Sequence, residues 1–248
     1  MKILGIHVDN VSREEALSKV SEFLLSDKQY KIFTPNPEML VDAQKDDYFM
    51  KVLNDGDLNL CDGRGIQLVS KEKIERIPGT DFMLDICVLA EQKKCSVYFL
   101  GSGSREVVSR AGANIQSRFP QLKICGFHEG PEIKRSKDQK IIVDEVEQDK
   151  IVDDIIQKAP DILFVAFGHV KQEKWIHENL KDLPSVKVGM GVGGAFDYIS
   201  GTKKRAPQWM RRLGMEWLYR VMYEPKRIMR IWRAVVIFLF LNFFKKSH

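Results

Sequence analysis

The segment Ser96-Val-Tyr-Phe-Leu100-Gly101-Ser-Gly103-Ser104-Arg105 has the pattern of a strand, a glycine turn and the start of a helix. Its first five residues form a short apolar run that predicts a strand, the glycines predict a tight turn, and Ser104 is typical of a residue that caps a helix. Because backbone N–H groups at such a turn can hold a phosphate, Gly101 and Gly103 are candidates for nucleotide binding. The motif is weak, since Glu106 replaces the third glycine of the dinucleotide fingerprint, and a plain strand-to-helix turn remains the alternative.

The same alternation of short apolar runs and longer amphipathic stretches continues on both sides, from Lys2 to Ile199. It predicts an α/β fold, a sheet covered by helices. Strands are expected at Ile3–Val8, Lys31–Thr34, Leu58–Cys61, Ser96–Leu100, Leu122–Phe127, Ile162–Phe167 and Val186–Met190. Helices are expected at Arg13–Leu25 after a capping box of Ser12 and Glu15, after the Asn36-Pro37 pair, from Ser104 to about Arg118, and over Asp138–Lys158.

From Ala206 onward the chain changes character, because no further strand pattern follows. Four apolar residues recur at four-residue steps and predict one helix that Pro225 ends: Trp209, Leu213, Trp217 and Val221. Residues 203–248 hold twelve Lys or Arg and two Asp or Glu, so their net charge of +10 exceeds the +5 of the whole chain and leaves residues 1–202 at −5. We therefore expect an α/β core, residues 1–202, and a basic helical appendage, residues 203–248.

The longest apolar run, Ala234–Phe244, lies inside this basic appendage. It has about half of the roughly 20 residues that span a bilayer, which favours a helix lying in the headgroup region of an anionic membrane. The N-terminus lacks the apolar stretch of a signal peptide. The four cysteines have neither the spacing of zinc ligands nor the density of a disulfide scaffold, so we expect a cytoplasmic protein.

Four of the predicted strands end in polar or glycine-rich segments. They are Thr34-Pro-Asn-Pro-Glu38, Leu60-Cys-Asp62-Gly-Arg-Gly65, Phe167-Gly-His-Val-Lys-Gln-Glu173 and Gly191-Val-Gly-Gly-Ala-Phe-Asp197. Open α/β sheets bind ligands at the carboxyl ends of their parallel strands, so four such ends together predict one crevice. For Asp62 taken singly, a helix cap is a nearly equal alternative.

Two further patterns have a binding and a structural interpretation. Asp55-Gly56-Asp57 has the form that holds a divalent metal in some sugar-nucleotide enzymes, but a turn that ends a helix is the better explanation. The five histidines show no metal-ligand spacing, and we expect no metal site and no cofactor. Arg220, Arg227 and Arg230 share a helical face if Pro225 interrupts the helix only mildly, and guanidinium groups match phosphate oxygens; a solvated or lipid-facing basic surface is the alternative.

Taken in order, the polar strand ends together with Lys171-Gln-Glu-Lys-Trp175, Arg205-Ala-Pro207 and Glu216-Trp-Leu-Tyr-Arg220 through Glu224-Pro225 resemble the WecG/TagA/CpsF glycosyltransferase family over nearly the whole chain. The resemblance implies a Rossmann-like, mostly parallel core and an inverting, metal-independent reaction. Family members move a sugar from a UDP-sugar to a polyprenyl-diphosphate-linked sugar on the cytoplasmic face of the membrane. The chain is most similar to the TagA branch, which transfers N-acetylmannosamine onto undecaprenyl-diphospho-N-acetylglucosamine in wall teichoic acid synthesis.

The resemblance also implies roles for individual residues. They are Asp62 as the base, Thr34, Asn36 and Gln172 as substrate contacts, Arg220, Arg227 and Arg230 as diphosphate ligands, and Gly101, Gly103, Gly193 and Gly194 as nucleotide contacts. Two departures stand out. Gly168-His-Val170 precedes Lys171 where the family pattern has a proline, which bears on sugar-nucleotide specificity. Lys134–Lys150 looks like an insertion that is expected to alter only a surface helix.

Several alternatives stay open. The donor could be another UDP-sugar, such as the uronic acid of N-acetylmannosamine, and a homo-oligomer is possible. A metal-dependent transferase would use Asp55 and Asp57. A non-catalytic module would bind nucleic acid or membrane through the basic tail and its aromatic residues, but it would leave Asp62 and the glycine-rich strand ends without a purpose, so we expect no nucleic-acid partner.

Overall fold

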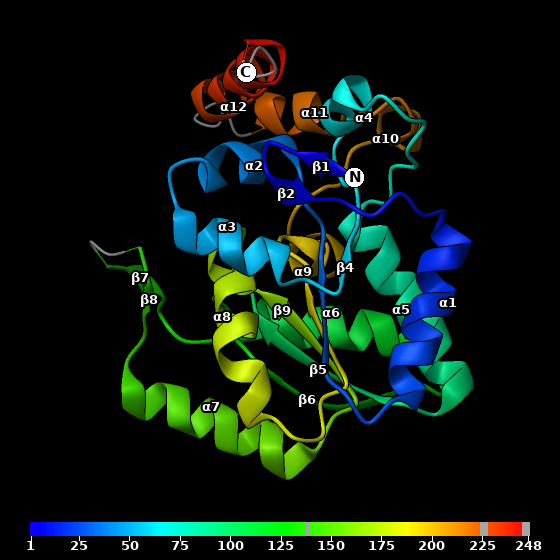
Figure 1. Cartoon of the computed structure of the whole chain (residues 1–248). Coiled ribbons are helices and arrows are strands. Elements are labelled where there is room, and N and C mark those ends of the chain that lie inside the picture. Colours follow the sequence, from blue (N-terminus) through cyan, green and yellow to red (C-terminus); the bar gives the residue numbers. More distant parts are fainter. Residues whose placement is uncertain (137–138, 224–227, 245–248) are drawn as a thin grey trace.

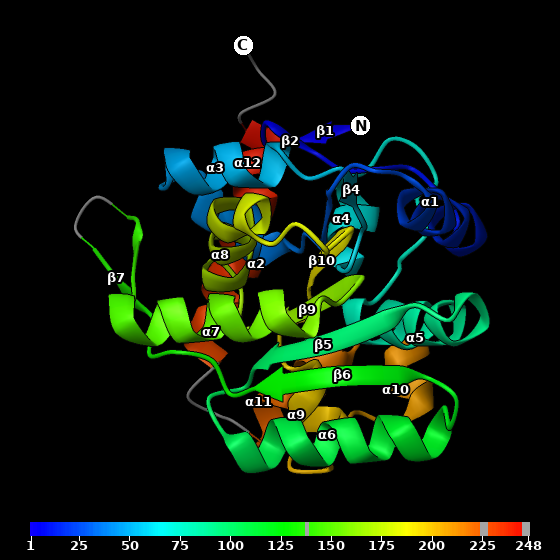
Figure 2. The ribbon, with the colours of Figure 1, turned by 90° about the horizontal axis from the view of Figure 1, so that it is seen from below.

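The computed structural model describes residues 1–136, 139–223 and 228–244. Its centre is a parallel sheet of six strands in the order β4-β3-β10-β9-β5-β6 (Figure 1). The strands are β3 (Tyr30–Phe33), β4 (Leu58–Asn59), β5 (Ser96–Gly101), β6 (Lys123–His128), β9 (Ile162–Ala166) and β10 (Val188–Gly191). Figure 2 shows β10, β9, β5 and β6 side by side in this order. The expected α/β fold and all expected strands but the first are confirmed, with shifted ends.

Helices cover both faces of the sheet. One face carries α1 (Arg13–Leu25), α5 (Gly79–Lys93), α6 (Arg105–Arg118) and α9 (Ala195–Ile199), and the other carries α2 (Pro37–Ala43), α3 (Asp47–Asn54), α7 (Glu145–Lys158) and α8 (Lys171–Asn179), which the 3₁₀ turn η1 (Leu180–Asp182) follows. Side chains of a strand alternate between its faces, so Val97 and Phe99 of β5 join the first core, and Tyr98 and Leu100 join the second. The strands β5, β9 and β10 are buried along their whole length, as a parallel sheet with helices on both faces requires.

Three helices begin where the sequence predicts. Ser12 and Glu15 form both bonds of the capping box before α1. The side chain of Asn36 accepts a hydrogen bond from the backbone of Met39, with a proline in the first turn of α2. Ser104 caps α6. These side chains satisfy backbone N–H groups that have no partner within the helix.

The expected strand Ile3–Val8 is wrong. The segment forms a hairpin of two short antiparallel strands outside the main sheet, β1 (Lys2–Ile3) and β2 (Ile6–His7). Leu4 and Gly5 turn the chain between them with φ of 49° and 81°. Glycine adopts positive φ without steric cost, so Gly5 permits the reversal.

The expected helix Asp138–Lys158 is wrong at its start. α7 begins at Glu145, because Asp144 caps it by accepting from the backbone of Glu147 at 3.0 Å. The preceding residues form a second hairpin, β7 (Lys134–Arg135) and β8 (Ile141–Ile142), and the β-branched pair in β8 favours a strand. Residues 137 and 138 lie outside the described residues.

Two lysines of α8 fasten this hairpin to the body. The ammonium group of Lys171 donates to the carbonyl oxygen of Ile133 at 2.6 Å. Lys174 has a fully buried side chain and donates both to the carboxylate of Asp46, at 2.6 Å, and to the carbonyl oxygen of Gln139. The segment expected to alter only a surface helix, Lys134–Lys150, therefore comprises a hairpin held against the body and the first residues of α7.

The C-terminal segment, residues 203–248, forms α10 (Gln208–Arg212), α11 (Glu216–Tyr223) and α12 (Ile228–Phe244). The single helix expected before Pro225 is wrong, because Gly214 has φ of 71° and separates α10 from α11. Pro225 itself lies outside the described residues. α12 lies against α2 and α4 (Arg64–Val69), at the top of Figure 1. None of the helices that the structure describes is long and apolar enough to cross a membrane.

Candidate functional site

A cavity of about 590 Å³ opens at the carboxyl ends of the six sheet strands. Each strand contributes a lining residue just beyond its end: Thr34 after β3, Asp62 after β4, Ser102 after β5, Glu129 after β6, Phe167 after β9 and Val192 after β10. The four polar strand ends singled out in the sequence therefore meet in one cavity, at the edge where open α/β sheets bind ligands.

Most of the predicted site residues line this cavity. They are Thr34, Asn36, Asp62, Gly103, Gln172, Gly193 and Gly194. Gly101 is not part of the lining: it has φ of 119°, and a Cβ there would lie 2.7 Å from the backbone of Ala166, so it serves the close approach of β5 and β9. Arg227 lies outside the described residues, as do the side chains of Arg220 and Arg230.

The loop that carries Asp62 packs on the segment that carries Asn36. The backbone N–H of Asp62 donates to the carbonyl oxygen of Pro35 at 3.1 Å. A Cβ on Gly63 would lie 2.4 Å from Cδ of Pro37, and one on Gly65 would lie 2.7 Å from Cγ of the same ring. Both glycines are therefore needed for close packing, and this packing fixes where the Asp62 carboxylate enters the cavity.

Gln172 is almost enclosed, with 3% of its surface exposed. Its carbonyl oxygen accepts from the backbone N–H of Gly193 at 2.9 Å, and its amide nitrogen donates to the carboxylate of Glu173 at 2.7 Å. Burial raises the pKa of Glu173, and its second carboxylate oxygen is buried without a hydrogen-bond partner among the described residues. Gln172 therefore ties the start of α8 to the glycine turn after β10 and so shapes the cavity wall.

The turn before α8 differs from one that a proline would make. Val170 has φ of 71° and ψ of −47°, a conformation that is rare and strained for a β-branched residue. A proline ring fixes φ at about −65°, so a proline does not fit the backbone at this position. The turn places the Nε2 of His169 3.0 Å from Asp42 and 3.8 Å from Glu38. These three residues offer ligand atoms within 4.8 Å of one another, a group that could hold a metal ion and that the sequence did not reveal.

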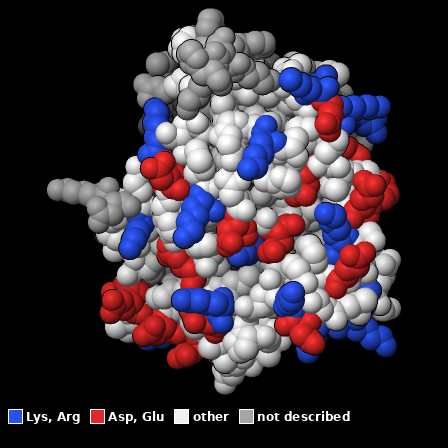
Figure 3. Space-filling model, viewed as in Figure 1, with Lys and Arg blue, Asp and Glu red and all other residues white. Residues whose placement is uncertain are grey.

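The charges that line the cavity are more acidic than basic. Among the residues that the structure describes, the lining holds four carboxylates, two lysines and one histidine: Glu38, Asp62, Glu129 and Asp197, and Lys171, Lys203 and His169. Lys203 is already paired with Asp197 at 2.7 Å. Elsewhere on the face shown in Figure 3, acidic and basic side chains are interspersed. A diphosphate in this cavity would need further cations.

Other residues that line the cavity are not predicted as site residues from the sequence. Asp197 and His169 belong to quoted segments, but only the fold places their side chains at the cavity. Lys203 lies just past the expected end of the core, and only its ion pair with Asp197 in the folded structure shows that it belongs to the site. Thr80 and Tyr198 carry no sequence signal at all.

Asp55 and Asp57 do not line the cavity. Asp55 ends α3 and is paired with the side chains of Lys31 and His177, and Asp57 accepts from the backbone of Lys31 at 2.8 Å. Burial would raise the pKa of Asp55, but Lys31 and His177 bring it below its usual value. These bonds fit the helix-ending turn rather than an open metal site. Next to Asp62, burial raises the pKa of the Cys61 thiol to about 11, so this thiol stays protonated at neutral pH.

The chain matches the family described as "Glycosyl transferase WecG/TagA/CpsF family" over residues 1–248. The N-acetylglucosaminyldiphosphoundecaprenol N-acetyl-beta-D-mannosaminyltransferase of Bacillus subtilis is 34% identical over 204 residues, 81% of this chain and 74% of that protein. The protein of the same name from Staphylococcus aureus is 30% identical over 244 residues, 96% of this chain and 90% of its own length. With a family match from the first residue to the last and relatives aligned over most of their length, the chain belongs to the WecG/TagA/CpsF family of glycosyltransferases.

Proposed function

We propose that this protein transfers N-acetylmannosamine from a UDP-sugar donor to undecaprenyl-diphospho-N-acetylglucosamine. The acceptor and the transferred sugar are those in the names of its Bacillus and Staphylococcus relatives. The observation that carries the proposal is a carboxylate, Asp62, in a cavity built from the ends of all six strands.

In this proposal Asp62 is the general base. It takes the proton from the acceptor hydroxyl, whose oxygen attacks the anomeric carbon of the donor sugar while the bond to the UDP oxygen breaks. Attack opposite to the leaving group inverts the configuration at that carbon. A positioned base typically contributes about 10²–10⁴-fold in rate. Thr34 and Asn36 are proposed as substrate contacts; the carbonyl oxygen of Asn36 already caps α2, which leaves its amide nitrogen for that role.

The leaving UDP develops negative charge on its diphosphate, and the described part of the cavity lining carries more acidic than basic side chains. We assign this role to Arg220, Arg227 and Arg230, on the segment whose net charge is +10. Preorganised donors aimed at developing charge contribute several kcal/mol, typically about 3–4 for one donor. Gly103, at the turn before α6, and the Gly193-Gly194 turn are proposed as nucleotide contacts, because both line the cavity.

The lipid acceptor requires contact with a membrane, and α12 has a surface suited to it. Phe238 is buried against the body, with its ring near Gly65. Trp232, Val236 and Phe240, one helical turn apart, are exposed. An exposed apolar stripe on a helix with a basic flank is typical of an interfacial helix. We therefore propose that the protein is peripheral on the cytoplasmic face of the membrane.

The test of this function is incubation of the full chain with a panel of UDP-sugars and a polyprenyl-diphospho-N-acetylglucosamine acceptor, with product mass as readout. The proposal expects one added N-acetylhexosamine and a strong preference for UDP-N-acetylmannosamine. Preference for its uronic acid, or no transfer with any donor, would contradict it.

The arginines are tested by single replacements with lysine at positions 220, 227 and 230, which keep the charge and lose the bidentate hydrogen bonding of a guanidinium group. A fall in transfer is expected for each. Full activity in all three variants would favour a general electrostatic role on the membrane surface.

A further inference from the structure

The C-terminal segment contacts the Asp62 loop directly at two points. Gly214, in the turn between α10 and α11, is so close to the side chain of Arg64 that a Cβ there would lie 2.7 Å from its Cδ. Gly65 faces Phe238 of α12, whose ring carbon would lie 3.6 Å from an added Cβ. The residues that follow Asp62 are therefore covered by the segment that carries the proposed diphosphate arginines.

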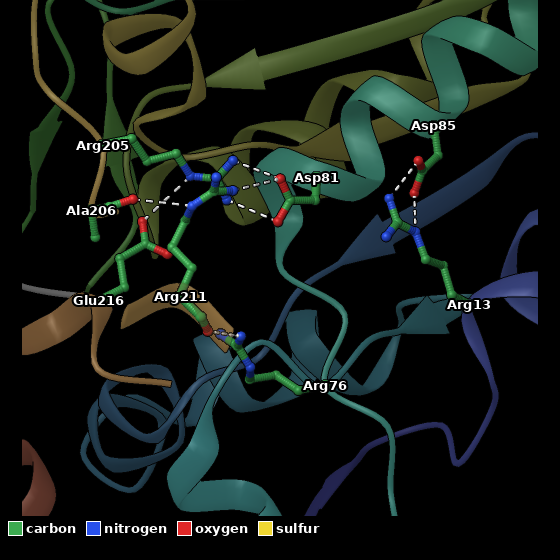
Figure 4. A network of polar contacts seen from close by, with 8 residues as sticks. All are labelled: Arg13, Arg76, Asp81, Asp85, Arg205, Ala206, Arg211 and Glu216. Carbon is green, nitrogen blue, oxygen red and sulfur yellow. Dashed lines mark hydrogen bonds and ion pairs between the residues drawn. The ribbon is translucent and has the colours of Figure 1, made fainter. Parts of the chain in front are cut away.

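One partly buried ion pair fastens this segment to the cavity wall (Figure 4). Arg205 donates through both terminal nitrogens to the carboxylate of Asp81, at 2.6 and 3.0 Å. Asp81 stands in the first turn of α5, directly after Gly79 and Thr80, which line the cavity. The pair thus joins the beginning of the C-terminal segment to residues of the site.

Further contacts extend the pair into α10 and α11. The Nε of Arg205 lies 3.7 Å from the carboxylate of Glu216 in α11. Arg211 of α10 lies 3.6 Å from Asp81, donates to Ala206, and accepts at its carbonyl oxygen from Arg76. Only 18% of the Arg205 side chain is exposed, so water screens the pair less than it would at the surface.

We propose that Arg205 is a positioning residue, and that its pair with Asp81 is a clasp that holds the C-terminal segment in the docked arrangement required for donor binding. This inference rests on the proposed function, in which arginines of that segment hold the diphosphate. Burial would lower the pKa of Arg205, but its bond to Asp81 and the charges of Asp81, Glu216 and Asp62 raise it. Arg205 therefore stays charged, and the carboxylate of the proposed base, Asp62, is one of the groups that act on it.

The clasp predicts a particular kinetic signature. If the segment exchanges between docked and undocked states and the donor binds the docked one, loss of the clasp lowers the apparent donor affinity by the lost docked fraction. Saturating donor restores the docked state, so KM rises while kcat is largely kept. A purely structural role, in which less protein folds, would lower kcat and leave KM unchanged.

The experiment measures kcat and the donor KM for the full chain with UDP-N-acetylmannosamine and a short-chain polyprenyl-diphospho-N-acetylglucosamine. Arg205→Lys and Asp81→Asn should each raise KM about tenfold or more, the effect of losing a charge-assisted hydrogen bond. The double variant should be no worse than the more damaging single one, because both break the same contact. Calorimetric binding of UDP should weaken in parallel.

The chain offers a matched control on the same helix. Arg13 of α1 forms a two-pronged pair with Asp85 of α5, at 2.5 Å for both bonds, away from the C-terminal segment (Figure 4). Arg13→Lys should leave KM within about twofold, since 44% of the Arg13 side chain is exposed and ion pairs open to water contribute little. An unchanged KM and UDP affinity in both clasp variants would overturn the proposal, as would an equal effect of Arg13→Lys.

The test of the clasp can be distinguished from a failure of Asp62 as the catalytic base. UDP binding needs no catalysis, so it reports on the clasp even if Asp62→Asn keeps full turnover. Thermal unfolding of each variant checks that the protein is folded, and Asp81→Asn serves as the second variant if Arg205→Lys folds poorly. Additive effects of the two substitutions would also contradict a shared contact.

Discussion

Glu173 carries a carboxyl group that the fold encloses completely. One of its oxygens accepts from the amide of Gln172, and the other has no hydrogen-bond partner among the described side chains and backbone. Burial disfavours the charged form and raises its pKa above the ordinary value of 4.5. The residue thus orients Gln172, and through it the Gly193 turn, at a cost in stability that depends on pH.

The sign of this dependence follows from proton binding. Between the ordinary pKa of 4.5 and the raised pKa of the folded protein, the folded state binds more protons at Glu173 than the unfolded state does. The contribution of Glu173 to stability is therefore fully present at low pH and is lost as the pH rises through this window. At neutral pH a neutral residue of the same shape should be tolerated better than the carboxylate.

Glu173→Gln should accordingly gain stability over the unsubstituted protein as the pH rises from about 4.5, because the amide cannot ionise. Urea unfolding of both proteins at several pH values measures the difference. Glu75→Gln, an exposed replacement away from the site, is the control. A difference that does not change with pH would show that Glu173 is not buried as a strained carboxylate.

Sequence patterns predict that certain polar residues come to the cavity, but they do not reveal the hydrogen bonds that these residues make within the protein. Asn36 and Gln172 were both expected as substrate contacts and both line it. Yet Asn36 caps α2, and both ends of the Gln172 amide are bonded within the protein. These bonds join segments far apart in the chain, so no local pattern could reveal them.

Secondary-structure elements were predictable where local chemistry determines them. The capping box before α1 and the apolar runs of β5 and β9 act over a few residues, and both kinds of element form as expected. The predictions are wrong where a single residue interrupts the repeating pattern of apolar residues. Gly5 allows a hairpin where one strand is expected. Asp144 caps α7, so that the helix begins at Glu145 and not at Asp138, and Gly214 divides an expected helix in two. In each case a cap or a positive φ outweighs the apolar repeat.

A cluster shared by α2 and the turn before α8 bears on whether the reaction needs a metal. Glu38 and Asp42 lie on α2, and His169 faces them from the strained turn. We predict that excess EDTA leaves transfer unchanged, because in the proposed function the C-terminal arginines neutralise the diphosphate, and because His169 is already paired with both carboxylates. Initial rates with and without EDTA measure this.

If EDTA abolished transfer and Mg²⁺ or Mn²⁺ restored it, the arginine account would be contradicted. Two variants would then locate the metal. His169→Ala should remove the response to metal if the cluster binds it, and Asp55→Asn should remove it if the pair in the α3 turn does.

The C-terminal helix α12 has a buried and an exposed surface. Phe238 and Asn242 face the body and are buried, whereas Trp232, Val236 and Phe240 are 63%, 42% and 58% exposed. Deletion of the helix would uncover the core around Phe238, so substitutions separate its two roles better than truncation does.

Replacement of Trp232, Val236 and Phe240 together by Gln should weaken sedimentation with anionic vesicles and leave thermal unfolding unchanged. Transfer to a water-soluble, short-chain acceptor should persist. The matched control replaces three exposed apolar residues of the body, Leu25, Val146 and Ile156, by Gln. Equal vesicle binding by both triple variants would contradict the anchor and favour a contact between copies of the chain.

In the proposed mechanism Asp62 removes the acceptor proton in the cavity formed by the strand ends. The direct measurement is the turnover of Asp62→Asn with UDP-N-acetylmannosamine and the lipid-diphosphate acceptor, beside its binding of UDP. The substitution keeps size and removes basicity, so turnover should fall at least about a hundredfold while UDP affinity and thermal unfolding stay as they were. Turnover close to that of the unsubstituted protein would contradict the account.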